Sequence, residues 1–207
     1  MKKVISQATI DRLPLYFRTL RLVEEEEKQI ISSDELGRRL DITPEQIRKD
    51  LATFGQFGRK GIGYDVHELK NKIANILGLH NNWRLAIVGI GHLGGALANY
   101  GNFDTLGFSV VALLDINENI IGSEVNGLKI ENSALMKDVI EKKFVDIGVI
   151  TVPASEAQAV AEQLIEAGIK GIWNFAPIKL SVPANIPLVN EDLSVGLSAL
   201  SYHMSQC

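Results

Sequence analysis

The segment Gly89-Ile90-Gly91-His92-Leu93-Gly94 constrains the fold more than any other part of the chain. It follows the apolar run from Leu85 to Val88 and opens a stretch with helical character that we expect to end at Tyr100. Three glycines at this spacing suit a tight turn between a parallel strand and a helix, with room for a phosphate group against the backbone. An acidic residue, Asp115, closes the next apolar run at the distance that this kind of unit requires. The pattern predicts a Rossmann-like unit.

Apolar runs and helical stretches alternate through the rest of the chain. Besides residues 85–88, strands are expected at 110–114, 129–130, 147–151, 171–173 and 188–189, and helices at 94–100, 132–143 and 155–167. Several of these strands are apolar at nearly every position, which is typical of parallel strands that are buried on both faces. The alternation predicts an α/β fold with a doubly wound parallel sheet.

Composition sets the broad class of the protein. Its 207 residues suffice for two small domains, and 46% hydrophobic with 22% charged residues is ordinary for a folded chain. No apolar run approaches the roughly 20 residues that span a bilayer, and the N-terminus lacks the apolar core of a secretory signal. The only cysteine is Cys207, the last residue, which excludes an internal disulfide or a multi-cysteine metal site. We expect a cytoplasmic protein without a metal centre or a membrane partner.

The first third of the chain follows a different plan. Apolar residues at helical spacing predict a helix from about Thr9 to Glu26. Ser32, with Glu35 three positions later, forms a capping box at the start of a second, short helix. Thr43 followed by Pro44 marks another helix start after a brief turn. Two short helices joined this closely predict a helix-turn-helix unit, whose second helix enters the major groove of DNA.

Polar side chains on the second of these helices are candidates for contacts with DNA. Ile47, Leu51 and Phe54 share its apolar side, which leaves the opposite side to face outward. The glycine-rich segment 55–64 looks like the wing of a winged helix, with two basic residues at its tip. Arginine and glutamine suit base edges, and lysine suits phosphates. The DNA-binding candidates are Gln46, Arg48, Lys49, Thr53, Arg59 and Lys60.

The distribution of charge agrees with this division. Residues 1–80 carry a net charge of +2 and residues 81–207 a net charge of −6. Six cations gather within 23 residues that hold only three acids: Arg38, Arg39, Arg48, Lys49, Arg59 and Lys60. Such a patch pairs with phosphates, and on charge alone a solvated charged face is the alternative.

Three segments are expected in total. A winged-helix DNA-binding domain covers residues 1–80 and ends in an amphipathic helix from Val66 to Leu79. A Rossmann-like domain that binds NAD(H) covers residues 81–190. Residues 191–207 form a C-terminal helix whose apolar side needs a partner surface. That side consists of Leu193, Leu197, Leu200 and Met204.

The glycine motif and Asp115 together predict the cofactor. In such a motif the first glycine allows the turn, the second lets backbone amides approach a pyrophosphate, and the third permits close packing of helix on strand. The carboxylate of Asp115 suits ribose hydroxyls and repels a 2′-phosphate, and no arginine follows it, which favours NAD(H) over NADP(H). Loops after the later strands should lie at the nicotinamide. The cofactor-binding candidates are Gly89, Ile90, Gly91, His92, Leu93, Gly94, Asp115, Thr151, Val152, Pro153, Asn174 and Phe175.

These loops offer no catalytic residues. Neither segment 151–153 nor segment 174–177 holds a proton-transfer residue with an orienting carboxylate, and the four histidines suit packing or surface positions better. We therefore do not expect an enzyme. The alternatives are a small NAD-dependent oxidoreductase with a helical dimerisation head, a CoA-binding module, and a helical scaffold for protein contacts.

Four motifs carry a resemblance that runs through almost the entire chain. They are Arg48-Lys49-Asp50-Leu51 in the helix-turn-helix, Phe57 to Tyr64 in the wing, Ile87 to Gly91 with Gly94, and Gly171 to Pro177. In these motifs the chain resembles the bacterial redox-sensing repressors called Rex. The combination is far more discriminating than the glycine motif alone.

The resemblance implies a homodimer whose C-terminal helices are swapped, each inserted between the two domains of the partner. It implies a repressor that binds operator DNA and is released by NADH, so that the cellular NADH/NAD+ ratio controls fermentation and respiration genes. It further implies that Arg18, Tyr100 and Asp192 belong to a switch network that links the head, the cofactor domain and the swapped helix.

Overall fold

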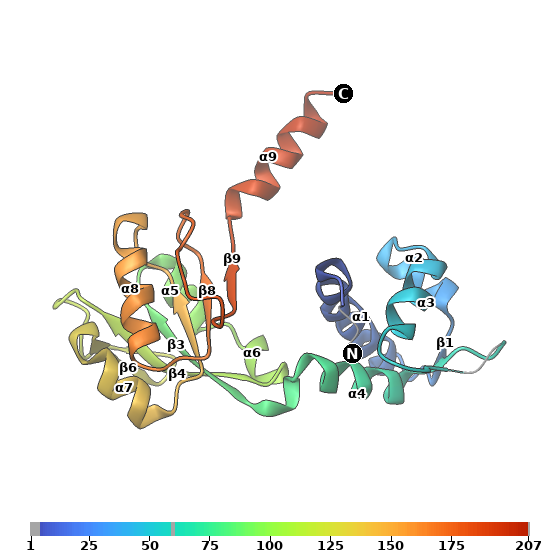
Figure 1. The fold of residues 1–207 in the computed structure, drawn as a ribbon, viewed down its shortest axis with the longest axis horizontal. Helices are drawn as coiled ribbons and strands as arrows, with labels where there is room; N and C mark the ends of the chain where they lie inside the picture. Colours follow the sequence, from blue (N-terminus) through green and yellow to red (C-terminus); the bar gives the residue numbers. More distant parts are fainter. Residues whose placement is uncertain (1–4, 59–60, 207) are drawn as a thin grey trace. The chain divides into compact units, whose positions relative to one another are not determined.

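The computed structural model describes residues 5–58 and 61–206 of the chain. Arg59 and Lys60, predicted at the tip of the wing, lie outside the described residues. By its internal contacts the chain divides into two compact units, Met1–Asn81 and Asn82–Cys207, and Figure 1 labels their helices and many of their strands. No helix in the described part is long and apolar enough to cross a membrane.

The first unit is mainly helical. Its helices are α1 (Gln7–Glu25), α2 (Ser33–Leu40), α3 (Pro44–Ala52) and α4 (Val66–Leu77), followed by the 3-10 turn η1 (Leu79–Asn81). Helices α1 and α4 pack along each other, and Glu24 of α1 accepts hydrogen bonds from His67 and Lys70 of α4. The buried side chains of this core include Leu13, Tyr16, Leu20, Leu36, Ile47, Leu51, Leu69 and Ile73. All four helices were predicted, with small differences at their ends.

Polar side chains begin the short helices as predicted. The hydroxyl oxygen of Ser32 accepts a hydrogen bond from the backbone N–H of Glu35 at 3.1 Å. The hydroxyl oxygen of Thr43 accepts from the backbone N–H of Gln46 at 3.3 Å, at the start of α3. Asp41 ends α2 in the left-handed conformation, with φ at 55°, which makes the turn into α3 tight. The helix-turn-helix is therefore confirmed.

The wing is only partly a strand pair. In the described part of segment 55–64, the only strand residue is Tyr64, which begins β2 (Tyr64–Asp65). Its antiparallel partner is β1 (Ile30–Ile31), which precedes α2. The sequence analysis did not predict β1, because a strand of two residues carries too little periodicity to be recognised.

The second unit is built around a single sheet. Its strands are β3 (Trp83–Val88), β4 (Phe108–Asp115), β5 (Glu124–Val125), β6 (Leu128–Asn132), β7 (Ile147–Ile150), β8 (Gly171–Asn174) and β9 (Leu188–Asn190). They lie in the order β5-β6-β4-β3-β7-β8-β9, and every pair is parallel apart from β5 with β6. Numbered along the chain, the parallel strands follow the order 3-2-1-4-5-6 of dinucleotide-binding sheets. The doubly wound sheet is confirmed.

Helices cover both faces of this sheet. On one face, α7 (Met136–Lys143) and α8 (Ala154–Glu166) bury residues such as Ile140 and Leu164 against the strands. On the other face, Ala98 of α5 (His92–Ala98) joins a second buried cluster. Figure 1 shows α7 and α8 beside the central strands. The apolar residues of β3 and β4 are shared between both clusters, which explains why these strands lack alternation.

Two predicted helices of the second unit differ in detail. The helix predicted at 94–100 is α5, which begins and ends two residues earlier, and the short α6 (Asn102–Thr105) that follows it was not predicted. The helix predicted at 132–143 begins with the 3-10 turn η2 (Ser133–Leu135) and continues as α7. The sequence analysis missed the β5–β6 hairpin, whose turn is Asn126-Gly127 with φ values of 50° and 75°. An Asn-Gly pair is a strong hairpin signal that could have revealed it.

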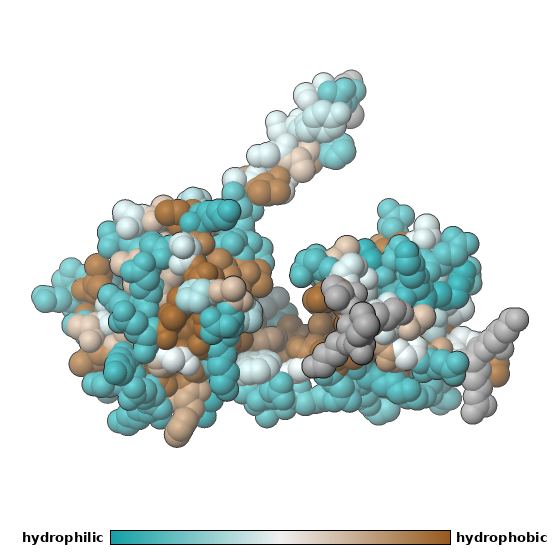
Figure 2. All heavy atoms as spheres, in the orientation of Figure 1, coloured by the Kyte–Doolittle hydropathy of each residue, from teal (hydrophilic) through white to brown (hydrophobic). Residues whose placement is uncertain are grey.

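The C-terminal helix α9 (Leu193–Met204) has no buried residue. Its large apolar side chains are exposed, with fractions of 70% for Leu197 and 69% for Met204. The only ionisable side chains of α9 are those of Tyr202 and His203. Figure 2 shows brown and pale residues along this helix. A helix with this composition requires a covering surface that the isolated chain does not provide.

Candidate cofactor pocket and nucleic-acid interface

The glycine motif forms a close turn between β3 and α5. Gly89 has a φ of 94°, and a Cβ atom there would lie 2.8 Å from Cγ1 of Val152. A Cβ atom on Gly94 would lie 2.0 Å from the carbonyl oxygen of Gly89. At Gly91, by contrast, an added Cβ would meet no described atom within 4 Å. The outer glycines therefore allow close packing, and Gly91 leaves open space at the N-terminus of α5, where a pyrophosphate group fits.

Asp115 ends β4 and is joined to the glycine turn. Its Oδ2 accepts a hydrogen bond from the backbone N–H of Ile90 at 2.6 Å, and its Oδ1 accepts one from the backbone N–H of Asn117 at 2.8 Å. These two bonds hold the carboxylate in one orientation and leave lone pairs for further donors, such as ribose hydroxyls. Ile90 differs from the expectation for a cofactor contact, because its side chain is buried and its N–H is already bound to Asp115.

A pocket of about 580 Å³ opens beside the glycine turn. It lies where the strand order reverses, between the carboxyl ends of β3, β4 and β7, which is where doubly wound sheets bind their ligands. The predicted residues that line it are Gly89, Gly91, Asp115, Thr151, Val152 and Pro153. His92, Leu93, Gly94, Asn174 and Phe175 are not among its lining residues. The pocket thus unites half of the predicted cofactor residues.

The side chain of Asn174 is engaged within the protein. It is fully buried, and its amide nitrogen donates to the carbonyl oxygens of Ala176 and Ile178 and to Oδ1 of Asn190. Its own Oδ1 accepts the backbone N–H of Ala176 at 3.0 Å. Asn174 therefore holds the loop after β8, and its amide nitrogen and oxygen are both engaged in hydrogen bonds within the protein.

An aromatic cluster lies next to this loop. Its rings are in edge or tilted contact, with centroid separations of 4.9 Å for Tyr100 and Phe103, 5.9 Å for Phe103 and Trp173, and 4.6 Å for Trp173 and Phe175. The indole N–H of Trp173 donates to Oε1 of Glu191 at 3.3 Å, just before α9. The cluster connects Tyr100, a predicted switch residue, with Phe175, a predicted cofactor residue.

Sequence reasoning missed several residues of the pocket. Ser133 follows β6, and Glu156 and Gln163 lie on α8. The signal was available, because Ser133 and Glu156 come shortly after the carboxyl ends of strands that were predicted. In a doubly wound sheet the first turns of the helices that follow the strands face the switch point, as the loops do.

The exposed side of α3 carries the candidate DNA contacts. Arg48 and Lys49 are exposed, and Nη1 of Arg48 donates to the hydroxyl oxygen of Ser33 on α2 at 2.7 Å. Arg48 also lines a groove of about 680 Å³ between α2, α3 and the segment 55–64. Thr53 is half-buried, and its hydroxyl donates to the carbonyl oxygen of Lys49 at 3.1 Å. The helix-turn-helix thus presents basic side chains beside this groove.

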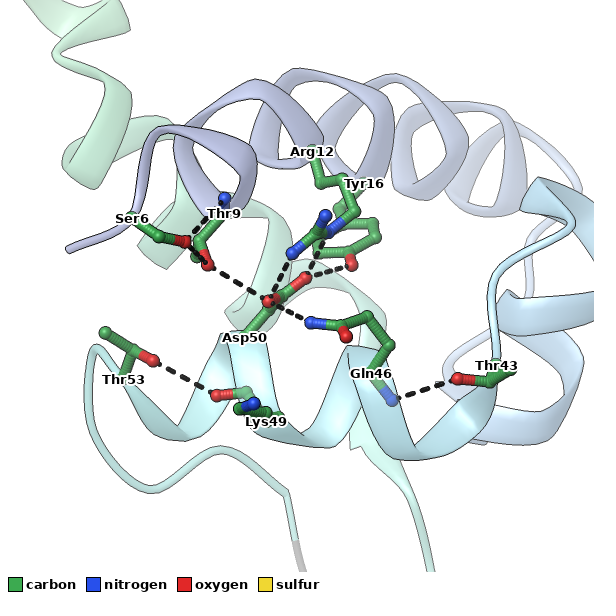
Figure 3. A network of polar contacts seen from close by, with 9 residues as sticks. All are labelled: Ser6, Thr9, Arg12, Tyr16, Thr43, Gln46, Lys49, Asp50 and Thr53. Carbon is green, nitrogen blue, oxygen red and sulfur yellow. Dashed lines mark hydrogen bonds and ion pairs between the residues drawn. The ribbon is translucent and has the colours of Figure 1, made fainter.

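Asp50 is the main polar residue of this unit that the sequence analysis gave no role. Figure 3 shows its carboxylate between α1 and α3 with four donors around it. The guanidinium of Arg12 binds both oxygens, at 2.6 and 2.8 Å. Three further groups donate to it: the hydroxyls of Thr9 and Tyr16, and the amide of Gln46. Its position was readable, because Asp50 lies on the same helical side as Ile47 and Leu51.

These contacts control the protonation of Asp50. Burial by itself raises the pKa of Asp50, but the hydrogen bonds from Arg12, Tyr16 and Gln46 outweigh it and lower the pKa to about 2. Burial, with the hydrogen bond to the carboxylate, raises the pKa of Tyr16 above its usual range. Asp50 is thus an anion and accepts hydrogen bonds only.

The remaining switch candidates lie in different units. Arg18 is exposed on α1, and its side chain makes no hydrogen bond or ion pair with the described part of the chain. Asp192 precedes α9, and its Oδ1 accepts the backbone N–H of Ser194 at 2.8 Å and the Ser194 hydroxyl at 2.6 Å. These bonds lower the pKa of Asp192. Asp192 is therefore the N-cap of α9.

Comparison with protein families assigns the two units separately. A family described as "Putative DNA-binding protein N-terminus" matches residues 4–52. A family described as "CoA binding domain" matches residues 80–178. Among solved structures, RSP in complex with β-NAD+ and operator DNA is 40% identical, with a TM-score of 0.93 over 99% of this chain and 94% of that chain. RSP in complex with β-NADH is 38% identical, with a TM-score of 0.90 over 99% of this chain and 96% of that one.

Relatives match over nearly the full length of the chain. The redox-sensing transcriptional repressor Rex of Syntrophobacter fumaroxidans is 46% identical, over 97% of this chain and 96% of that protein. The protein of the same name from Clostridium perfringens strain SM101 is 44% identical, over 97% of this chain and 95% of that protein. With this identity along both the helix-turn-helix and the dinucleotide sheet, the chain belongs to the Rex family of redox-sensing transcriptional repressors.

Proposed function

We propose that this chain is a homodimeric repressor that binds operator DNA through α3 and releases it when NADH occupies the pocket beside Gly91. One observation carries the proposal: a basic helix-turn-helix and a dinucleotide pocket with an acid at the end of β4 occur in a single chain. The names of its relatives, and the NAD+, NADH and operator DNA in the titles of the RSP structures, support it. Such a regulator would act in the cytoplasm, where bacterial operators lie.

The pocket fits the proposed cofactor. The N-terminus of α5 has no side-chain cap, and the open space at Gly91 lets a pyrophosphate approach its backbone N–H groups. Asp115 would accept hydrogen bonds from the ribose hydroxyls, and its negative charge would repel the 2′-phosphate of NADPH. Thr151, Val152 and Pro153 would contact the part of the cofactor that lies past the switch point. Asn174 would act there indirectly, by holding the loop that carries Phe175.

Discrimination between the two oxidation states must come from outside the glycine turn. NAD+ and NADH share the adenosine and the pyrophosphate, so contacts at Gly91 and Asp115 shift no equilibrium. The cofactor itself supplies the redox signal, because the nicotinamide ring of NAD+ carries a positive charge that NADH lacks. A conformation that buries the ring among apolar side chains would favour NADH. Moving a repressor from 1:99 to 99:1 takes about 5.5 kcal/mol of differential affinity, which two sites of a dimer could share.

Dimerisation through α9 would complete the switch. All described residues from 189 to 206 are exposed in the single chain, so the apolar side of α9 would be free to pack against a second copy. A swapped α9 would bring Asp192 of one chain toward Arg18 and Tyr100 of the other and couple the cofactor domain to the head. Because a dimer reads half-sites about 34 Å apart, a modest rotation of the heads would break the register.

The alternatives predict different observations. An oxidoreductase would need an acid–base pair at the cofactor; among the described residues that line the pocket, the ionisable ones are Asp115, which binds backbone N–H groups, and the exposed Glu156. We therefore propose a regulator without enzymatic turnover. A CoA-binding module, suggested by the family match over residues 80–178, would bind CoA in competition with NADH.

One titration tests the proposal. Duplexes that the protein retains from a random library would be used for fluorescence anisotropy with NADH, NAD+, NADPH or CoA added. We expect NADH to release the duplex at concentrations where NAD+ leaves it bound, and NADPH and CoA to have little effect. Binding that is insensitive to the oxidation state, or release by CoA alone, would refute the proposed function.

A further inference from the structure

Gln46 has a fixed orientation at the start of the recognition helix. It is the third residue of α3, and its amide nitrogen donates to Oδ1 of Asp50, one turn later, at 2.8 Å. Because the Asp50 carboxylate only accepts hydrogen bonds, the nitrogen of the Gln46 amide must face it. Figure 3 shows this arrangement. The amide oxygen of Gln46, which has no hydrogen-bond partner in the described part of the chain, is left for another molecule.

The network around Asp50 fixes the geometry of the contact between α1 and α3. Asp50 is 1% exposed and receives five hydrogen bonds, two of them from Arg12. A buried ion pair loses hydration energy on folding, and apolar residues of similar volume stabilise a core as well or better. What the ion pair adds is orientation, because charge-assisted bonds hold α3 against α1 in one geometry. Gln46 is the member of the network that lies at the end of α3 expected to reach base edges.

We propose that Asp50 is a positioning residue for operator recognition: it presents the Gln46 amide oxygen outward, as a reader of adenine. The inference rests on the proposed function, because it assumes that α3 lies in the major groove. An amide oxygen can only accept a hydrogen bond, and phosphate oxygens cannot donate one, so the donor that duplex DNA offers to this oxygen in the major groove is a base amino group. Adenine offers its N6 amino group together with N7, which suits the second amide hydrogen of Gln46. Cytosine lacks the N7 acceptor, and guanine and thymine present carbonyl oxygens that would face the Gln46 oxygen.

The first test locates the adenine. After selection of an operator, each deoxyadenosine of one half-site would be replaced in turn by purine 2′-deoxyriboside, whose base lacks the N6 amino group. Affinities would be measured by anisotropy for the native protein and for Gln46→Met, which keeps the length of the side chain. At one position we expect the replacement to weaken native binding about tenfold and to have little effect on Gln46→Met. Equal losses in both proteins at every position would overturn the reading role of Gln46.

The second test addresses Asp50. In Asp50→Asn the new amide can donate as well as accept, so the Gln46 amide is free to turn round. We expect discrimination at the same adenine to fall to the level of Gln46→Met, with no further loss in the double variant. Tyr16→Phe is the matched control: it removes one hydrogen bond to Asp50 but keeps the carboxylate and its contact with Gln46, so discrimination should persist. Full discrimination by Asp50→Asn would overturn the positioning role.

A third measurement does not depend on the folding of Asp50→Asn. In native protein with 15N-labelled glutamine, the Gln46 amide resonance is identified by its loss in Gln46→Met. We expect one of its two hydrogens to be protected from exchange by the bond to Asp50. Two hydrogens that exchange equally fast would overturn the proposal. A protein that binds DNA and responds to NADH but reads no adenine through Gln46 would refute this inference alone, whereas absence of operator binding would refute the proposed function.

Discussion

The hydroxyl of Thr151 donates a hydrogen bond to the carbonyl oxygen of Gly89 at 2.7 Å, and so ties the end of β7 to the turn after β3. The same carbonyl oxygen is the atom that a Cβ on Gly94 would strike. Two loops that are 62 residues apart in sequence therefore meet at one backbone group. Since this group lies at the reversal of the strand order, the walls of the pocket are held by the packing of the sheet.

Gly94→Ala should impair the pocket. Its Cβ would lie 2.0 Å from the backbone of Gly89, which can yield only by moving the turn that carries Gly91. We expect at least about a tenfold loss of NADH affinity, measured by calorimetry, together with a lower melting temperature. Gly101→Ala is the matched control, because an added Cβ there meets no described atom within 4 Å. An unchanged affinity in Gly94→Ala would contradict the packing role.

Asp115→Asn should weaken the preference for NADH over NADPH. The variant keeps the size of the side chain but removes the charge that would repel a 2′-phosphate. The ratio of the two dissociation constants is the relevant measurement, since loss of the bond to Ile90 will weaken both. Glu156→Gln serves as control for another acid of the same pocket. A relaxed preference in Glu156→Gln alone would assign the rejection of phosphate to Glu156.

Arg48→Ala should weaken operator binding by about tenfold or more and leave NADH affinity unchanged, because the two sites lie in different units. If Arg48 meets a phosphate, the slope of log affinity against log salt should also fall by about one. Ser33→Ala removes the hydrogen bond to Arg48 but keeps its charge, and we expect a smaller loss. Parallel loss of DNA and NADH binding in Arg48→Ala would count against the division into two functional units.

Asp192→Asn should separate NADH binding from DNA release. Asparagine caps a helix about as well as aspartate, so α9 keeps its bonds from Ser194 while the charge proposed to face Arg18 is lost. We expect both ligands to bind with near-native affinity but NADH to release the operator poorly. Asp192→Ala would be less informative, since it also removes the cap. Normal NADH-driven release by Asp192→Asn would exclude Asp192 from the switch.

The stability of the head should depend on acid through Asp50. Its pKa is lowered from an unfolded value near 3.8 to about 2, so its contribution is complete above about pH 4 and is lost as the pH falls through 2. The shift corresponds to about 2 kcal/mol. Urea unfolding monitored between pH 5 and pH 2 should show this loss in the native protein and a shallower dependence in Asp50→Asn. The same slope in both would show that other carboxyl groups dominate.

Local signals in the sequence located most of the elements. The caps at Ser32 and Thr43 and the glycine turn after β3 were correct because each depends on neighbours within a few residues. The alternation of strands and helices indicated a doubly wound parallel sheet, and the order of its strands came from the structure. The β5–β6 hairpin was not predicted, although the Asn126-Gly127 pair at its turn is a local signal of the same kind.

The chain by itself determined that a helix-turn-helix precedes a dinucleotide-binding sheet, because caps, periodicity and the glycine motif are short-range properties. Only the tertiary structure decided which polar atoms remain available. Asn174 and Ile90 were expected at the cofactor, but their polar groups are used by the fold, and Gln46 is turned by Asp50. Asp115 reaches Ile90 from another strand, whereas Ala176 and Asp50 are close in sequence to Asn174 and Gln46. In each case the packing of the fold sets the burial and orientation that bring donor and acceptor together, and buried polar groups must be satisfied there.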